Sequence, residues 1–262
     1  MDKNGSVVRF VFVVSLLITG GLYVNSAEAG MSLTAEIAEK QVKHDYKDSS
    51  APDATAIFRG DIGTIIIGVN YNQGRFFSSI NLEQSWKDDI ALLNNESILF
   101  LDRTDYALTF GYAVFERMSV FVGYKYGETS IYGIDVGIDA GTPGYNDLAF
   151  IDEGPFLGIS YSQPVTDKSV LGFSLAYADM DAETENRIDP YGGPGAGPAS
   201  ATGSVDGLST GIKWSYELSE STLLNIGYKL NSYDAEGTNM TGDDYTLESD
   251  YEFVTFGLRH YF

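Results

Sequence analysis

Two histidines, His44 and His260, are the side chains of this sequence that could act as general bases near neutral pH. A histidine base usually needs a carboxylate that orients it. Asp45 adjoins His44, but adjacent side chains of a strand point to opposite faces, so Asp45 is not its natural partner. The acids that could approach His44 across the rim of a β structure are Asp88, Asp89, Asp102 and Asp105. An outer-rim hydrolase that uses His44 is therefore a remote alternative, and we expect no enzymatic activity and no cofactor.

Closely spaced acids could bind a hard cation. Asp179, Asp181, Glu183 and Glu185 alternate along one segment, and oxygen-rich runs of this kind suit calcium or magnesium. The run does not match the twelve-residue calcium loop, which needs its glycine and its terminal glutamate. These four residues are weak metal candidates. The alternative is a solvated acidic face that deters aggregation.

The overall charge excludes several classes of protein. The chain of 262 residues carries 37 acidic and 16 basic residues, for a net charge of −21. A surface of that sign repels phosphate groups, so no nucleic-acid partner is expected. The sequence holds no cysteine, which excludes disulfides, thiolate metal sites and cysteine catalysis.

Residues 1–29 have the pattern of a secretory signal peptide. Lys3 and Arg9 precede a short apolar run, and Ala27-Glu28-Ala29 is a small-x-small cleavage site. The apolar run is shorter than the roughly 18–20 residues of a membrane-spanning helix. We therefore expect export and cleavage before Gly30.

The rest of the chain alternates with a period of two residues. In the segment 106–114, Tyr106, Leu108, Phe110, Tyr112 and Val114 share one face, and small residues share the other. The segments 170–178, 210–218 and 223–231 repeat this pattern. A period of two predicts β-strands. The faces are aromatic or aliphatic on one side and rich in Gly, Ala, Ser and Thr on the other, which suits lipid outside and a small lumen inside. A sheet exposed to lipid must close, because an open edge would leave backbone groups unpaired in hydrocarbon.

The connections and the last strand point to a known class. Short turns near residues 115–118, 164–168 and 219–220 alternate with long polar stretches, as periplasmic turns and outer loops do. The last strand alternates through Val254, Phe256, Leu258 and His260 to a terminal Phe262. Here the chain resembles the bacterial outer-membrane β-barrel proteins, of the small porin-like, OmpA- or OmpW-type class. The resemblance is architectural, and it implies an outer-membrane location, lipid and lipopolysaccharide contacts, and Phe262 as a signal for the barrel assembly machinery.

The sequence therefore predicts an all-β fold, a single antiparallel transmembrane β-barrel over residues 30–262. Counting back from Phe262 gives nine strands, and a barrel with both ends on the periplasmic side needs an even number. The weak pattern of residues 32–46 supplies a tenth strand. Eight strands is the alternative, in which residues 30–71 are partly a periplasmic segment or plug. Residues 30–58 are then either the first strand or a periplasmic segment. The five outer connections, expected at residues 43–61, 85–105, 127–153, 178–206 and 233–250, hold 27 of the 35 acids after residue 29.

Charges on the inward faces define the candidate lumen. The residues expected to line it are Glu83, Lys125, Lys213, Glu217, Lys229 and Arg259. They either form a salt-bridge network that closes a narrow barrel or line a thin aqueous pore, because a buried charge is costly unless it is paired or hydrated. The aromatic residues expected to anchor the barrel at the two membrane interfaces include Trp86, Tyr106, Tyr126, Tyr177, Trp214 and Tyr216.

Three functions follow from this frame. The first is a porin-like passive channel for ions or small polar solutes. The second is a closed barrel that acts in structure or surface interaction through acidic outer loops that bind divalent cations. The third is the outer-rim hydrolase, loosely similar to the ten-stranded omptin proteases, whose aspartate-x-histidine pairing is absent here. An open lumen would favour the first, full pairing of the lumen charges the second, and a carboxylate bonded to His44 the third.

Overall fold

The computed structural model describes residues 29–49, 55–86, 89–93, 97–135, 145–188, 199–238 and 243–262. The predicted signal peptide lies outside these residues, except for Ala29. All regular structure among the described residues is β-strand, and no helix there is long and apolar enough to cross a membrane. The strands are β1 (Gly30–Asp48), β2 (Thr55–Gln73), β3 (Phe76–Ser85), β4 (Asp89–Leu93), β5 (Ser97–Phe115), β6 (Met118–Asp135), β7 (Tyr145–Thr166), β8 (Ser169–Ile188), β9 (Ala199–Ser219), β10 (Thr222–Thr238) and β11 (Asp244–Tyr261).

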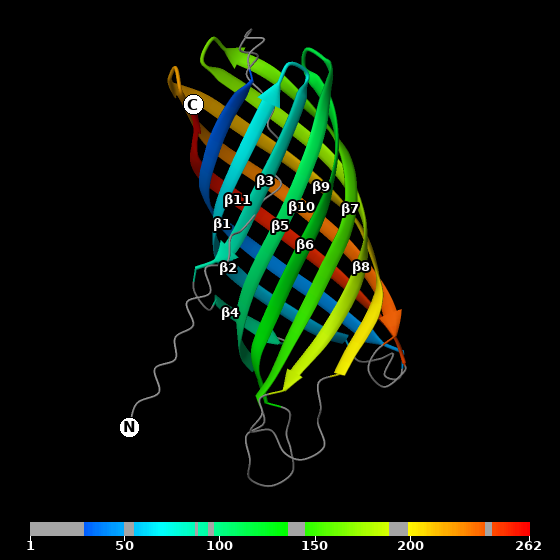
Figure 1. Cartoon of the computed structure of the whole chain (residues 1–262). Coiled ribbons are helices and arrows are strands. Elements are labelled where there is room, and N and C mark those ends of the chain that lie inside the picture. Colours follow the sequence, from blue (N-terminus) through cyan, green and yellow to red (C-terminus); the bar gives the residue numbers. More distant parts are fainter. Residues whose placement is uncertain are drawn as a thin grey trace, which may run out of the picture.

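The strands form one closed antiparallel barrel (Figure 1). Apart from β3 and β4, each strand pairs with its neighbours along the chain, and β1 pairs with both β11 and β2, which closes the ring. The short β4 and the longer β3 both lie between β2 and β5, so they share one position in the ring. The barrel therefore has ten strand positions, and the predicted ten-stranded fold is confirmed. Its tenth strand is β1, where the sequence pattern was weakest.

The short turns gather at the periplasmic end, where the C-terminus also lies (Figure 1). They join β2 to β3, β5 to β6, β7 to β8 and β9 to β10. Each of these turns has two residues between its strands. In the first turn Gly74 has φ of +60°, a conformation that glycine adopts without steric cost. Closure removes the exposed strand edges, so the barrel satisfies its backbone hydrogen bonds without a partner.

An outward apolar band, the membrane belt, surrounds the half of the barrel next to the periplasmic end. On β11 it consists of Val254, Phe256 and Leu258, all exposed on the outer face. The same band continues on every neighbouring strand, for example at Leu157 and Ile159 on β7. Exposed apolar side chains in a continuous ring are explained by lipid contact.

The strands continue far beyond this belt. β1 has 19 residues and β7 has 22, whereas about 9–11 residues of a tilted strand are enough to cross a bilayer. We call the strand segments beyond the belt the outer extension; on β1 it includes residues 39–48 and on β11 residues 244–252. Most of the predicted outer connections are therefore strand rather than loop, which corrects that expectation.

The apolar side chains lie on the outer face in the membrane half of the barrel and on the inner face in the outer half. Within the belt, the outside is apolar and the inside is polar or small, with Ser32, Thr34 and Asn70 buried. In the outer extension, the outside carries acids such as Asp234 and Glu248. The inside of the extension holds a cluster of buried apolar side chains, the outer core, which includes Val42, Phe58, Ile62, Leu101, Ile131, Met180, Val205, Leu247 and Tyr251. The extension thus has the pattern of a water-soluble β-barrel with a packed interior.

Candidate functional site

The lumen holds a layer of paired charges directly below the outer core. We call it the ion-pair layer: Lys40 on β1, Glu83 on β3, Arg103 and Asp105 on β5, Lys125 on β6 and Asp152 on β7. Each side chain points inward because it stands at the inward parity of its strand. Apart from Arg103 and Asp105, the members are far apart in sequence and meet because the wall of the barrel curves around one lumen.

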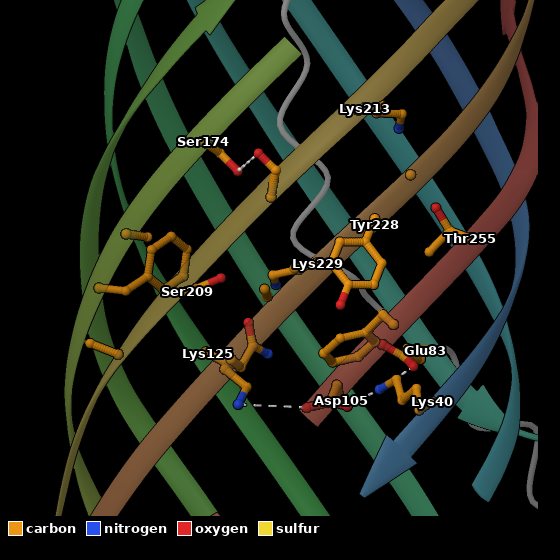
Figure 2. Close-up of a pocket in the computed structure, with 18 of the residues that line it drawn as sticks. Lys40, Glu83, Asp105, Lys125, Ser174, Ser209, Lys213, Tyr228, Lys229 and Thr255 are labelled. Atoms are coloured by element: carbon orange, nitrogen blue, oxygen red, sulfur yellow. Dashed lines mark hydrogen bonds and ion pairs between the residues drawn. The ribbon is translucent and has the colours of Figure 1, made fainter. Parts of the chain in front are cut away.

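Asp105 is the centre of this layer. Its carboxylate accepts hydrogen bonds from Arg103 Nε at 2.8 Å and Arg103 Nη2 at 2.6 Å. Lys40 Nζ donates to Asp105 Oδ2 at 3.2 Å and also forms an ion pair with Glu83. Lys125 Nζ donates to Asp152 Oδ2 at 2.6 Å. Three cations and three carboxylates therefore balance each other across the lumen. Figure 2 shows four of them, Lys40, Glu83, Asp105 and Lys125.

Aromatic rings cover the cations of the layer. The guanidinium of Arg103 lies 4.6 Å from the ring centre of Tyr251, and Lys125 Nζ lies 4.7 Å from that of Tyr233. Lys40 Nζ lies 4.5 Å from the ring centre of Phe253. These distances suit cation–π attraction. The rings also join the ion-pair layer to the outer core above it.

Inward rings fill part of the lumen within the belt as well. Phe77 packs against Gly111, and the pair Phe121 and Phe156 packs against Gly158 and Gly123. A side chain at any of these three glycines would collide with a ring. The β5–β7 side of the lumen is therefore filled by aromatic side chains.

A second polar cluster lies nearer the periplasmic end. Lys213 Nζ donates to Glu36 Oε1 at 2.9 Å, and Asn225 Nδ2 donates to the same oxygen at 3.3 Å. Arg259 Nε donates to Thr34 Oγ1 at 3.2 Å. Together these contacts link β1, β9, β10 and β11 from inside.

A cavity of about 90 Å³ separates the two clusters on the β8–β10 side (Figure 2). Small residues of β8, β9 and β10 form its wall, including Gly172, Ser174, Gly211 and Gly227. Lys229 projects into it, with its Nζ 5.6 Å from the ring centre of Phe253. Since one water needs about 10–15 Å³, the cavity can hold several waters.

The structure places the predicted lumen residues as follows. Glu83 and Lys125 are in the ion-pair layer, Lys213 and Arg259 are in the lower polar cluster, and Lys229 is in the cavity. Glu217 is half-buried close to the turn before β8, where its backbone N–H donates to the Lys168 carbonyl at 2.8 Å. The sequence interpretation missed five further lumen charges, Glu36, Lys40, Arg103, Asp105 and Asp152. The first two are on the weakly patterned β1, and the other three stand in segments that were expected to be outer loops.

His44 lies inside the outer extension rather than at its rim. Its Nδ1 is 2.7 Å from Ser249 Oγ, and its ring stacks against Phe150 with the ring centres 6.0 Å apart. Among the described residues, no carboxylate is bonded to His44, and its Nε2 has no hydrogen-bond partner. Burial, with a contribution from Arg103, lowers the pKa of His44 to about 3. A base this weak and this enclosed does not fit the hydrolase alternative.

The acidic candidates lie on the outer face of the extension. Asp179 and Asp181 are exposed on β8, and Glu183 and Glu185 are partly exposed. Among the described residues, no three acidic or histidine side chains come together as a metal site. The weak metal candidates therefore form a surface, not a chelating group, in the part of the chain that the structure describes.

These acids belong to a longer acidic row. Asp179 pairs with Asp206 across β8 and β9, Asp206 pairs with Asp234 across β9 and β10, and Asp234 pairs with Glu248 across β10 and β11. Directly opposed residues of neighbouring strands have Cβ atoms about 4.5–5.5 Å apart, and like charges at that distance repel. Lys47 Nζ forms an ion pair with Glu248 Oε1 at 3.2 Å, which compensates one of these charges. The acidic row is therefore an electrostatically unfavourable surface that attracts cations.

The predicted anchoring aromatics lie on the outside of the barrel. Tyr106 and Tyr126 are cross-strand partners with ring centres 5.6 Å apart. Trp214 and Tyr216 stack near the periplasmic end, also with ring centres 5.6 Å apart. Trp86 and Tyr177 are exposed on the outer face. Their anchoring role stays a prediction.

Comparisons with known proteins support the class of fold. No protein-family model and no curated protein matches the chain. Among solved structures, the outer membrane protease OmpT from Escherichia coli is similar with a TM-score of 0.64 and 10% identity, over 89% of this chain and 97% of that chain. The translocator domain of the autotransporter NalP from Neisseria meningitidis is similar with a TM-score of 0.41 and 12% identity, over 87% of this chain and 88% of that chain. The toluene transporter TodX from P. putida is similar with a TM-score of 0.35 and 10% identity, over 89% of this chain and 90% of that chain.

The closed ring, the membrane belt and the likeness to the fold of OmpT define a transmembrane β-barrel of the bacterial outer-membrane type. At 10% identity, the likeness to OmpT concerns the fold alone.

Proposed function

We propose that the protein is a closed outer-membrane barrel that acts through the acidic surface of its outer extension. The filling of the lumen supports this proposal. The ion-pair layer is balanced and covered by rings, and the outer core above it is packed with apolar side chains. Among the described residues, this apolar core interrupts the row of polar groups along which an ion could pass.

The partner of the outer extension is proposed to be a divalent cation layer shared with lipopolysaccharide. The acidic row begins on β8, directly above the belt residue Tyr177, where the anionic headgroups of an outer leaflet lie. Two anionic surfaces at this level repel unless divalent cations bridge them. In this role the barrel binds and orders the outer leaflet and performs no chemistry.

Two measurements test the proposal. Single-channel recordings of the refolded mature chain in a planar bilayer should show no unitary current steps, although folded protein is inserted. Binding of purified lipopolysaccharide should rise when calcium is added, and the triple variant Asp179→Asn, Asp206→Asn and Asp234→Asn should lose most of that rise.

A matched control for the triple variant exists on the periplasmic turns. Glu116, Asp167 and Glu220 are exposed there, and changing them to the corresponding amides alters the net charge by the same amount. This control should keep the calcium-dependent binding. Equal losses in the two triple variants would reject the acidic row as the binding surface.

A passive channel for ions or small solutes is the second candidate. The cavity favours it, because small residues and Lys229 line a space inside the belt that water can enter. Stable unitary conductance from the unaltered protein would establish this function and reject the closed barrel. A shift of the reversal potential in Lys229→Met would then assign the current to this lumen.

A further inference from the structure

The cavity beside Lys229 has unusual polar groups for an enclosed space in a membrane. Lys229 is half-buried, and among the described residues no carboxylate lies within ion-pair distance of its ammonium group. The Lys229 Nζ lies 5.6 Å from the ring centre of Phe253. A cation that leaves bulk water is costly unless an anion or solvent compensates it.

A buried hydroxyl faces the same space. Thr255 on β11 lines the cavity and is 6% exposed, and its Oγ1 has no hydrogen-bond partner among the described residues. Gly227 stands opposite Thr255 across β10 and β11, and a side chain at Gly227 would displace this hydroxyl. The glycine thus leaves room for the hydroxyl at the wall of the cavity. An unpartnered hydroxyl can donate one hydrogen bond to a ligand.

The strand register brings a second ammonium group to the same wall. Lys213 on β9 pairs with Gly227 on β10, and Lys229 on β10 pairs with Gly211 on β9. The two lysines are therefore diagonal neighbours on the inward face, and each has a glycine opposite it. Gly172 continues the open wall on β8, where an added Cβ would meet no atom closer than 3.6 Å. Figure 2 shows Lys213, Lys229 and Lys125 spread along the cavity.

We propose that this cavity binds one small oxyanion, a carboxylate or a phosphate. Lys229 supplies the principal charge, Thr255 donates a hydrogen bond, and Lys213, already bonded to Glu36, adds attraction. The cavity of about 90 Å³ admits an anion of a few heavy atoms and excludes larger solutes. The ion-pair layer and the outer core lie on its outer side, so the anion enters from the periplasmic end.

Isothermal titration calorimetry of the refolded mature chain in detergent tests the proposal, with inorganic phosphate and sodium acetate as probes. Saturable binding of one equivalent of either probe is expected. Binding of phosphate alone or of acetate alone would identify which oxyanion the site takes. Folding of each sample is verified by the shift in gel migration on heating.

Variants assign the binding to the cavity. Lys229→Met should weaken it at least about tenfold, because a charge-assisted hydrogen bond is lost, and Thr255→Val should weaken it several-fold. Lys229→Arg keeps the charge and should retain binding. Lys168→Met changes an exposed lysine on a periplasmic turn and should bind as the unaltered chain does.

The proposal fails if the folded chain shows no saturable binding of either anion. It also fails if Lys229→Met and Thr255→Val both bind with unchanged affinity. Neither result depends on channel conductance, so the oxyanion site and the closed-barrel function are tested separately.

Discussion

Arg103 and Asp105 stand two residues apart on β5 and form a two-point ion pair inside the barrel, with Arg103 Nε and Nη2 donating to the two carboxylate oxygens. The alternation of a strand places residues i and i+2 on the same face, so this pair needs no long-range contact to form. Long-range contacts then use it, because Lys40 from β1 donates to the same carboxylate. Asp105 therefore holds β1 and β5 together across the lumen.

Removing this carboxylate should strongly destabilise the barrel. In Asp105→Asn the guanidinium of Arg103 loses its two-point partner and Lys40 loses one of its two carboxylates. Breaking a buried ion pair from one side costs about 3–5 kcal/mol, because the remaining charge stays uncompensated. Urea unfolding in lipid vesicles, followed by tryptophan fluorescence, measures the loss. Asp167→Asn on a periplasmic turn is the control, and an equal effect of the two changes would contradict the role of Asp105.

The membrane half of the fold could be read from the sequence. Its outward side chains are large and apolar and its inward ones are small, as in residues 106–114, and this contrast exists only where lipid is the solvent. Register and parity then gave ten strands and the inward direction of Lys125, Lys213, Lys229 and Arg259. A local pattern is sufficient there because every strand faces the same two environments.

The outer extension could not be recognised in this way. There the outward residues are acids and other polar residues of the kind that fill loops, and the inward apolar residues alternate with them, as Tyr245, Leu247 and Tyr251 do on β11. The ion-pair layer was missed for the same reason, since Arg103, Asp105 and Asp152 were placed in loops. Which charges meet across the lumen depends on closure of the ring, and no local pattern encodes that.

The outer core should contribute more to stability than the membrane belt. Ile62 is 0% exposed in the outer core, whereas Ile80 is 57% exposed on the outside of β3. Ile62→Ala removes apolar contacts and leaves a cavity, which costs about 2–5 kcal/mol. Ile80→Ala loses transfer free energy to lipid but leaves no cavity, so we expect no more than about half that effect. The same unfolding measurement compares them, and a larger loss for Ile80→Ala would show that the outer core is loosely packed.

Acid should destabilise the outer extension through His44. Burial, with a contribution from Arg103, lowers the pKa of His44 in the folded chain to about 3, from 6.5. In the unfolded chain, His44 therefore takes up a proton as the pH falls below about 6.5. In the folded chain, the His44 ring stays neutral until about pH 3. Stability from this group is full above pH 6.5 and is lost at about 1.4 kcal/mol per pH unit below it.

The variant His44→Gln isolates that contribution. Its stability should fall less steeply than that of the unaltered chain between about pH 6 and pH 4, because the titrating ring is gone. A variant with His260→Gln keeps His44 and is expected to retain the acid-induced loss. Parallel pH profiles for the unaltered chain and His44→Gln would show that the ring is protonated in the folded barrel.

The terminal aromatic residue should matter for assembly and not for the stability of the finished barrel. The side chain of Phe262 is 81% exposed, while its backbone N–H closes the ring by donating to the Met31 carbonyl at 3.0 Å. Phe262→Ser keeps this backbone bond and removes a side chain that buries little area, so refolding into detergent and urea stability should stay within about 0.5 kcal/mol of the unaltered chain. If the side chain is read by the barrel assembly machinery, as the resemblance to outer-membrane barrels implies, the amount of folded protein in outer-membrane fractions should fall several-fold. Heat-modifiable gel migration of those fractions, compared with the refolded variant, separates the two effects. If cells contain equal amounts of folded Phe262→Ser and unaltered protein, Phe262 is not an assembly signal. If Phe262→Ser is lost to the same extent in refolding, the role of Phe262 is structural.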